Sequence, residues 1–297
     1  MLSTSRLRLT KLAFRTTSTK YCAIIDNLLF KHGRFACDRP QTCTLTFPSF
    51  GRPPAACPSF RLSNHILSRS IEVVDVSMPW VSFHRVHILQ GLPSVHTVRR
   101  HGFRSTMTQL KFASEVRTAV DFVVLGENMP TGPLISMSST QERHVIHIRF
   151  DRHEQQKCYP CVLFDLCGPT INLKEVVIAL WPDDINDGTE IFTAPILLAL
   201  IGELVPYLRF HGKLTIVGIE YLYGSHDTTY IRQDLWEFFI DLAGSKERAD
   251  EITEAISFVT FKEWEMQLGR RFELEGLWSP LTEVDVRLTE VGIAWSS

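Results

Sequence analysis

After residue 70 the chain repeats one spacing, in which an apolar residue is followed by a second three positions later and a third two positions after that. The copies are Ile71-Val74-Val76, a weaker Leu92-Val95-Thr97, Val120-Val123-Leu125, Val145-Ile148-Phe150, Leu173-Val176-Ile178, Leu214-Val217-Ile219 and Ile256-Val259-Phe261. Most copies lie inside β-branched runs, and successive side chains of a strand point to opposite faces. The pattern therefore predicts a series of short, buried strands.

The copies begin 21, 28, 25, 28, 41 and 42 residues apart. In leucine-rich repeats such a spacing arises because each unit contributes one short strand and buries its apolar face only against its neighbours. We therefore predict an α/β fold, an irregular leucine-rich-repeat-like stack of short strands and helices. The same residues also fit an ordinary α/β sheet, and this alternative stays open.

Helical spacing dominates the later part of the chain. One apolar face predicts a helix that ends at Gly244, and its members are Ile231, Leu235, Phe238, Phe239 and Leu242. Residues 246–255 predict a second, surface helix, followed by a strand around Phe258 and a short helix through Trp264. The predicted stack therefore ends in alternating helices and a strand.

The first 70 residues differ in composition from the rest. Their only acids are Asp26 and Asp38, and residues 40–58 contain five prolines without a sustained period. We predict a basic, mostly disordered region over 1–70, a repeat-like α/β domain over 71–277 and a C-terminal tail over 278–297. The first 20 residues hold five Lys or Arg, eight Ser or Thr and no acid. That composition is typical of a mitochondrial transit peptide, and equally of a solvated basic tail or a misplaced gene start.

Composition excludes several classes of protein. With 44% hydrophobic and 22% charged residues, the chain is neither collagen-like nor wholly disordered. No apolar run approaches the ~20 residues of a membrane span. Residues 1–117 hold 17 Lys and Arg against 5 Asp and Glu, and residues 181–297 hold 9 against 21. These two segments therefore carry formal charges of +12 and -12. The basic cluster of Arg99, Arg100, His101 and Arg104 lacks interleaved aromatic residues, so we expect a solvated loop and no nucleic-acid partner.

Chemistry-bearing side chains form only weak constellations. His153, Cys158, Cys161 and Cys167 are weak candidates for a metal site, because a second turn-spaced pair is missing; structural thiols are the alternative. His144 and His147 are three positions apart, so on a strand they face opposite sides and do not converge on a metal. Seven cysteines, an odd number, indicate reduced thiols in a cytosolic, nuclear or mitochondrial setting. We predict no catalytic residues and no cofactor.

Three segments carry a resemblance to a known family. Residues 92–102 (LPSVHTVRRHG), 213–220 (KLTIVGIE) and 257–269 (SFVTFKEWEMQLG), closed by 272–275 (FELE), resemble uncharacterised F-box-like proteins of basidiomycete yeasts, in which an F-box precedes an irregular leucine-rich-repeat-like domain. The resemblance covers about residues 66–277. It implies that an F-box helix remnant lies within 21–30, where Ile24, Ile25, Leu28 and Leu29 match the apolar face that contacts the ligase adaptor. The Leu-Pro-x-Glu opening of an F-box is absent.

We therefore expect a non-enzymatic protein-interaction protein, cytoplasmic or nuclear. The resemblance implies a substrate receptor of a cullin–RING ubiquitin ligase. The alternatives are a mitochondrially imported enzyme or metal-binding protein, favoured by the acid-free leader, and a degenerate gene product without activity.

Overall fold

The structure is a computed structural model of the 297-residue chain. It describes residues 31–39, 42–46, 71–77, 92–101, 116–125, 135–136, 141–150, 164–165, 173–181, 201–202, 204, 212–223 and 229–276. The apolar face predicted for the F-box remnant and the tail over 278–297 lie outside these residues.

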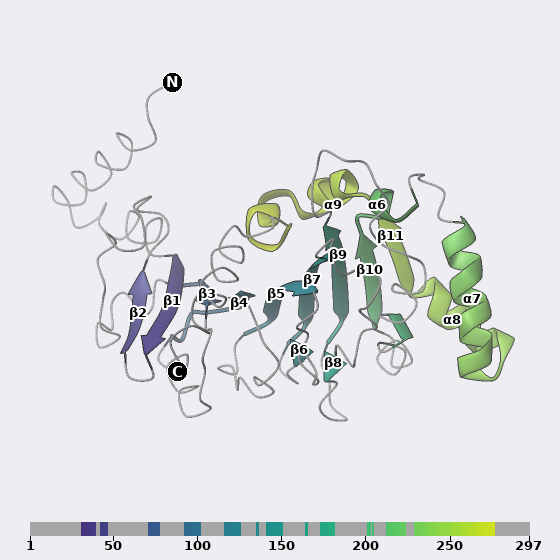
Figure 1. Ribbon diagram of the computed structural model, residues 1–297, viewed down its shortest axis with the longest axis horizontal. Helices are drawn as coiled ribbons and strands as arrows, with labels where there is room; N and C mark the ends of the chain where they lie inside the picture. Colours follow the sequence, from purple (N-terminus) through teal and green to yellow (C-terminus); the bar gives the residue numbers. More distant parts are fainter. Residues whose placement is uncertain are drawn as a thin grey trace, which may run out of the picture.

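One sheet runs through the molecule and carries nine strands of the described part of the chain (Figure 1). Its strands are β1 (His32–Arg39), β2 (Thr42–Thr46), β3 (Val73–Ser77), β4 (Thr97–His101), β5 (Thr118–Leu125), β7 (Arg143–Phe150), β9 (Glu175–Trp181), β10 (Lys213–Val217) and β11 (Ile256–Val259). Two further strands, β6 (Ile135–Ser136) and β8 (Phe164–Asp165), form a small separate pair.

From β3 to β11 the order of the strands in the sheet follows their order in the chain, and β1 lies between β3 and β2. From one edge to the other the sheet reads β11-β10-β9-β7-β5-β4-β3-β1-β2, and every neighbouring pair except β1–β2 is parallel. The described residues thus form a mixed α/β fold around eight parallel strands. Six of the seven copies of the predicted apolar spacing overlap a strand over at least four residues, so these six strand predictions are confirmed; the weak copy at Leu92 reaches β4 only at Thr97.

The beginning of the sheet differs from the sequence prediction. Strands β1 and β2 lie within residues 1–70, which the composition marks as mostly disordered. Strand β1 pairs in parallel with β3, from His32 opposite Val73 to Ala36 opposite Ser77. This Thr-, Arg- and Cys-containing stretch shows no strand periodicity in its sequence. It forms a strand because its apolar neighbour supplies the hydrogen-bond partners of its backbone. Residues 32–39 and 42–46 are therefore strands, where the composition predicts a mostly disordered region.

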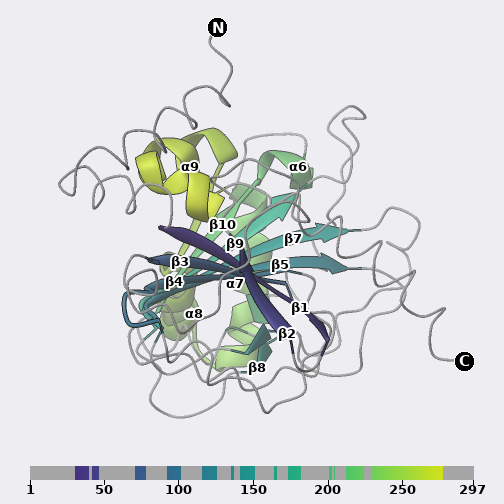
Figure 2. The same cartoon turned by 90° about the vertical axis from the view of Figure 1, so that its left-hand side faces the viewer.

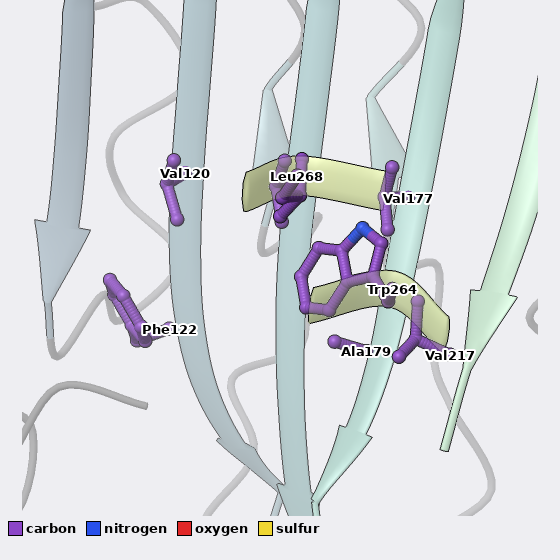
Figure 3. Close-up of a cluster of buried hydrophobic side chains, with 8 residues drawn as sticks. Val120, Phe122, Val177, Ala179, Val217, Trp264 and Leu268 are labelled. Carbon is purple, nitrogen blue, oxygen red and sulfur yellow. The ribbon is translucent and has the colours of Figure 1, made fainter. Parts of the chain in front are cut away.

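The C-terminal helix α9 (Phe261–Leu268) covers one face of the sheet. Trp264 and Leu268, one helical turn apart, are buried against a cluster that spans β5 to β10 (Figure 3). The strand members are Val120, Phe122, Val145, Val177, Ala179 and Val217. On the outer side of the helix, Met266 is 68% exposed. We call the covered side the α9 face.

Beside β11, the opposite face of the sheet contacts a pair of helices. Helices α7 (Thr229–Ala243) and α8 (Lys246–Glu254) pack on each other, and Leu235, Phe239 and Ile252 are buried. Val259 belongs to the α9 face, so its neighbour Phe258 points the other way, where the Arg232 guanidinium of α7 lies 5.1 Å from its ring centre. In the end-on view, α9 lies above the fan of strands (Figure 2).

Local signals fix the ends of these helices. A capping box at Thr260 and Glu263 begins α9: the Thr260 hydroxyl accepts from the Glu263 N–H, and the Glu263 carboxylate accepts from the Thr260 N–H. Gly244, with φ of +73°, ends α7 as the sequence predicts. Gly218, with φ of +88°, makes the turn from β10 into α6 (Glu220–Tyr223), where a Cβ would lie 2.5 Å from the Leu180 carbonyl oxygen.

After α9, two short helical turns, η5 (Gly269–Arg271) and η6 (Phe272–Gly276), complete the described chain. Phe272 meets Trp264 edge to face, so this segment continues the cover over the sheet. A helix with the length and apolar character of a bilayer span is not found in the described ranges.

Candidate functional site

The basic stretch that the sequence analysis assigns to a solvated loop is a buried strand. All five residues of β4, Thr97 to His101, are buried. The prediction of a solvated loop is therefore wrong for Arg99, Arg100 and His101. Charged side chains are rarely buried unless paired, and here alternate residues of β4 find acids on both sides of the sheet.

On the α9 face, β4 contributes to a cluster around Asp75 of β3. One Asp75 carboxylate oxygen lies 3.1 Å from His101 Nε2 and 3.4 Å from Arg99 Nε, and the other lies 2.8 Å from His32 Nε2. Burial by itself raises the pKa of Asp75, but the Arg99 charge and the two histidines outweigh it and hold that pKa well below its usual range. Asp75 is therefore a buried anion that joins β1, β3 and β4.

On the opposite face, the intervening Arg100 forms the second cluster. Its guanidinium makes a bidentate ion pair with the Asp121 carboxylate of β5. Asp121 also accepts a hydrogen bond from His144 Nε2 of β7 at 2.5 Å. Burial lowers the pKa of His144, so the ring is neutral and donates through Nε2. Burial also acts to raise the pKa of Asp121, but Arg100 and His144 outweigh it and the net direction is down. The buried His144 Nδ1 has no hydrogen-bond partner among the described residues.

A row of stacked rings crosses the α9 face from β4 to β7. His101, Phe122 and His147 occupy paired positions on β4, β5 and β7, and their rings stack at 4.6 and 4.7 Å between centres. The Trp181 indole N–H donates to His147 Nδ1 at 2.8 Å, and His147 Nε2 donates to the Glu275 carbonyl at 2.7 Å. Burial lowers the pKa of His147 to about 3, so this ring is neutral.

The same region anchors the last described residues to the sheet. Besides the carbonyl contact with His147, the buried Glu275 carboxylate lies 3.0 Å from Arg143 Nε and 3.8 Å from Arg271 Nη1. Arg143 also pairs with Glu175 on the next strand. The α9 face from β5 to β10 is therefore occupied by the chain's own C-terminal segment, and its polar residues serve that attachment.

Exposed charges line the amino end of the sheet, and we call this row the charged edge. Each member directly precedes a strand residue of equivalent register: Lys31, Glu72, His96, Arg117, Glu142 and Lys174. The N–H of every member after the first donates to the carbonyl of the member before it, so the row is regular across six strands. At about 4.8 Å per strand, it extends roughly 24 Å.

Each glutamate of the charged edge lies between two basic side chains. Lys31 Nζ lies 2.7 Å and His96 Nε2 3.4 Å from the Glu72 carboxylate, and Lys174 Nζ donates to Glu142 at 2.9 Å. The hydrogen bond from Lys174 lowers the pKa of Glu142. These contacts are exposed and add little stability, so the charges remain accessible to a partner.

The sequence-predicted site residues fall into two groups. The four apolar positions of the F-box remnant lie outside the described residues, as do the weak metal candidates His153, Cys158, Cys161 and Cys167. His144 and His147 are both described, and they face opposite sides of β7 as predicted, because one binds Asp121 and the other binds Glu275. Within the described ranges, no group of three or more His, Cys, Asp or Glu is arranged to hold a metal ion.

The polar residues of the described core mainly hold neighbouring strands together. Each of the two aspartate clusters is closed by its own cations and lies in the core, and the charged edge presents donors and acceptors at the surface. Sequence reasoning missed both clusters, although single acids inside apolar β-branched runs, Asp75 and Asp121, were a signal for buried pairing. Comparisons of the chain with protein families, curated proteins and solved structures find no match.

Proposed function

We propose that the protein is a non-enzymatic interaction protein that binds a protein partner along the charged edge. The observation that carries this proposal is the regularity of that edge, where six successive strands place an exposed polar or charged side chain at the same position. Sheets built by adding chain-adjacent strands create extended, one-dimensional surfaces, and repeat proteins use such surfaces to bind proteins. A leucine-rich-repeat-like stack is the finer fold that fits this order.

The order of charges along the edge favours a partner that places acidic groups opposite the exposed cations of the edge. Arg117 and Lys174 flank Glu142, and both basic side chains are about three-quarters exposed. The α9 face, the other large surface of the sheet, is covered from β5 to β10 by the chain itself. A partner therefore binds at the charged edge.

Within this proposal, the role in the cell is that of a substrate receptor of a cullin–RING ubiquitin ligase. It rests on the resemblance of residues 92–102, 213–220, 257–269 and 272–275 to F-box-like proteins. Ile24, Ile25, Leu28 and Leu29 then contact the adaptor, and the charged edge selects the substrate. A cytoplasmic or nuclear location fits this role.

Two paired variants of the full chain separate the two contacts. Full-length protein is used because β1 pairs with β3, so a truncation at residue 71 would remove part of the sheet. In the first variant, Arg117→Glu and Lys174→Glu reverse both exposed cations of the edge. Its control reverses Arg248 and Lys262, which are exposed on α8 and α9. The tagged proteins are purified from the native cell, and bound proteins are identified by quantitative mass spectrometry.

We expect the edge variant to lose its substrate proteins about tenfold or more, since like charges across an interface cost several kcal/mol, and the control to retain them. Equal capture by both would refute binding along the edge. The second variant, Ile24→Asp with Leu28→Asp, should lose the adaptor and keep the substrates, whereas Asn27→Asp keeps both. If the unaltered chain captures no adaptor, the ligase role is wrong, and the edge result is still interpretable.

A further inference from the structure

The antiparallel pair β1–β2 brings two cysteines to opposite positions. In its register, Ala36 faces Thr44 and Cys37 faces Cys43, after which an irregularity shifts the pairing before Arg39. The two residues are six positions apart in the sequence, joined by a short connection between the strands. This juxtaposition is set by the backbone, and the sequence analysis did not connect these two residues.

The spacing of opposed residues in an antiparallel pair matches the requirement of a disulfide. Directly facing Cα atoms lie about 4.5 or 5.5 Å apart, depending on whether the pair exchanges hydrogen bonds. Disulfides span about 4.4–6.8 Å between Cα atoms. Either kind of facing pair therefore falls within the range, and closure demands no change of register.

The position of the pair in the sheet gives the bond a defined effect. Strand β2 is the last strand of the nine-stranded order and, among the described strands, is paired with β1 alone. Strand β1 is held on its other side by β3, up to Ala36 opposite Ser77. Cys37 follows directly, so a bond to Cys43 would tie the end strand to the last firmly paired residues of the parallel sheet.

We propose that Cys37 and Cys43 are a thiol pair that closes reversibly into a cross-strand disulfide when the protein meets a low-molecular-weight disulfide such as glutathione disulfide. One thiolate attacks a sulfur of glutathione disulfide, forming a mixed disulfide and releasing one glutathione thiolate. The second cysteine thiolate then attacks the protein sulfur of the mixed disulfide and releases the second. The two thiol protons end on two molecules of glutathione, so the protein is oxidised by two electrons and glutathione disulfide is reduced.

The reduced state is the resting one, in keeping with an odd cysteine count. Closure then marks a more oxidising environment and fixes β2 to β1. The exchange reaction is tested without a partner and involves neither Arg117 nor Lys174, so its outcome does not depend on the proposed partner binding.

The test is thiol–disulfide exchange of the full chain in glutathione buffers of increasing disulfide content. Samples are quenched with acid, and free thiols are blocked with N-ethylmaleimide. Digestion with Asp-N, which cuts before Asp38, separates Cys37 from Cys43, and chymotrypsin, which cuts after Phe50, separates Cys43 from Cys57. Mass spectrometry then identifies which cysteines are joined.

We expect the Cys37–Cys43 peptide to form at a glutathione disulfide to thiol ratio about tenfold lower in the native chain than in the same chain in urea, because the register raises the effective concentration of the two thiols. Cys37→Ser and Cys43→Ser should each abolish the linked peptide, and the control Cys57→Ser should leave it unchanged. Equal ratios in native and unfolded chain, or Cys37 joined to Cys57 as often as to Cys43, would overturn the proposal.

Discussion

Removing the charge of Asp121 tests the buried cluster that joins β4, β5 and β7. The change Asp121→Asn keeps the shape of the side chain but leaves the Arg100 guanidinium without its counter-charge. The Arg100 and Asp121 side chains are 3% and 5% exposed, so water cannot replace the lost partner. Breaking a buried ion pair from one side typically costs about 3–5 kcal/mol, against a total stability of about 5–15 kcal/mol for a domain.

Urea denaturation followed by circular dichroism measures this loss directly. We expect the unfolding midpoint of Asp121→Asn to fall by the equivalent of about 3–5 kcal/mol. As a matched control, Glu142→Gln removes an exposed ion-pair partner of Lys174 on the neighbouring strand, and its midpoint should stay unchanged.

A double variant separates the attraction from the cost of burial. Arg100→Met with Asp121→Leu replaces both charges by apolar groups, and a buried pair exchanged in this way is often neutral in stability. We therefore expect the double variant to be more stable than Asp121→Asn. The reasoning fails if Asp121→Asn costs less than about 1 kcal/mol, or if the double variant is the least stable of the three.

Three further predictions concern the α9 face and the turn before α6. The pKa of His147 is about 3 in the folded protein and about 6.5 in the unfolded chain, so its contribution to stability is full above pH 6.5 and is lost as the pH falls towards 3. The free energies of unfolding from urea titrations at pH 7 and pH 5 should therefore differ by about 2 kcal/mol, and by less in His147→Gln. Trp264→Ala should lower the free energy of unfolding by about 3–5 kcal/mol, whereas Met266→Ala on the exposed side of the same helix should change it by less than about 0.5 kcal/mol. Gly218→Ala should lower the melting temperature more than Gly244→Ala, because both have positive φ but only the first Cβ meets backbone atoms.

Apolar periodicity was sufficient to predict six of the parallel strands after residue 70, namely β3, β5, β7, β9, β10 and β11. The runs around Val120, Val145 and Val177 are β-branched and buried on both faces, which is how strands of a covered parallel sheet are composed. Helices α7 to α9 were also predicted from the sequence, with Gly244 as the end of α7, whereas the Thr260–Glu263 capping box that begins α9 was seen only in the structure. These features depend on residues close together in the chain.

The features that sequence reasoning missed depend on distant residues. Arg100 reads as a solvated cation until Asp121, 21 positions later, is placed beside it by the register of β4 and β5. Strand β1 reads as irregular until β3, about 40 residues further on, supplies its hydrogen-bond partners. Periodicity carries no information about such pairs.

The attachment of Glu275 to His147 has a consequence for the newly made chain. Parallel strands here join neighbours already synthesised, so the sheet can grow as the chain leaves the ribosome. The segment that covers its α9 face cannot bind until much later, because the hydrogen bond between His147 and Glu275 spans 128 positions. At a synthesis rate of about 5–20 residues per second, the rings of Phe122 and His147 wait on the order of 10 s before α9 arrives. During that interval the nascent protein presents an uncovered aromatic surface that chaperones can recognise.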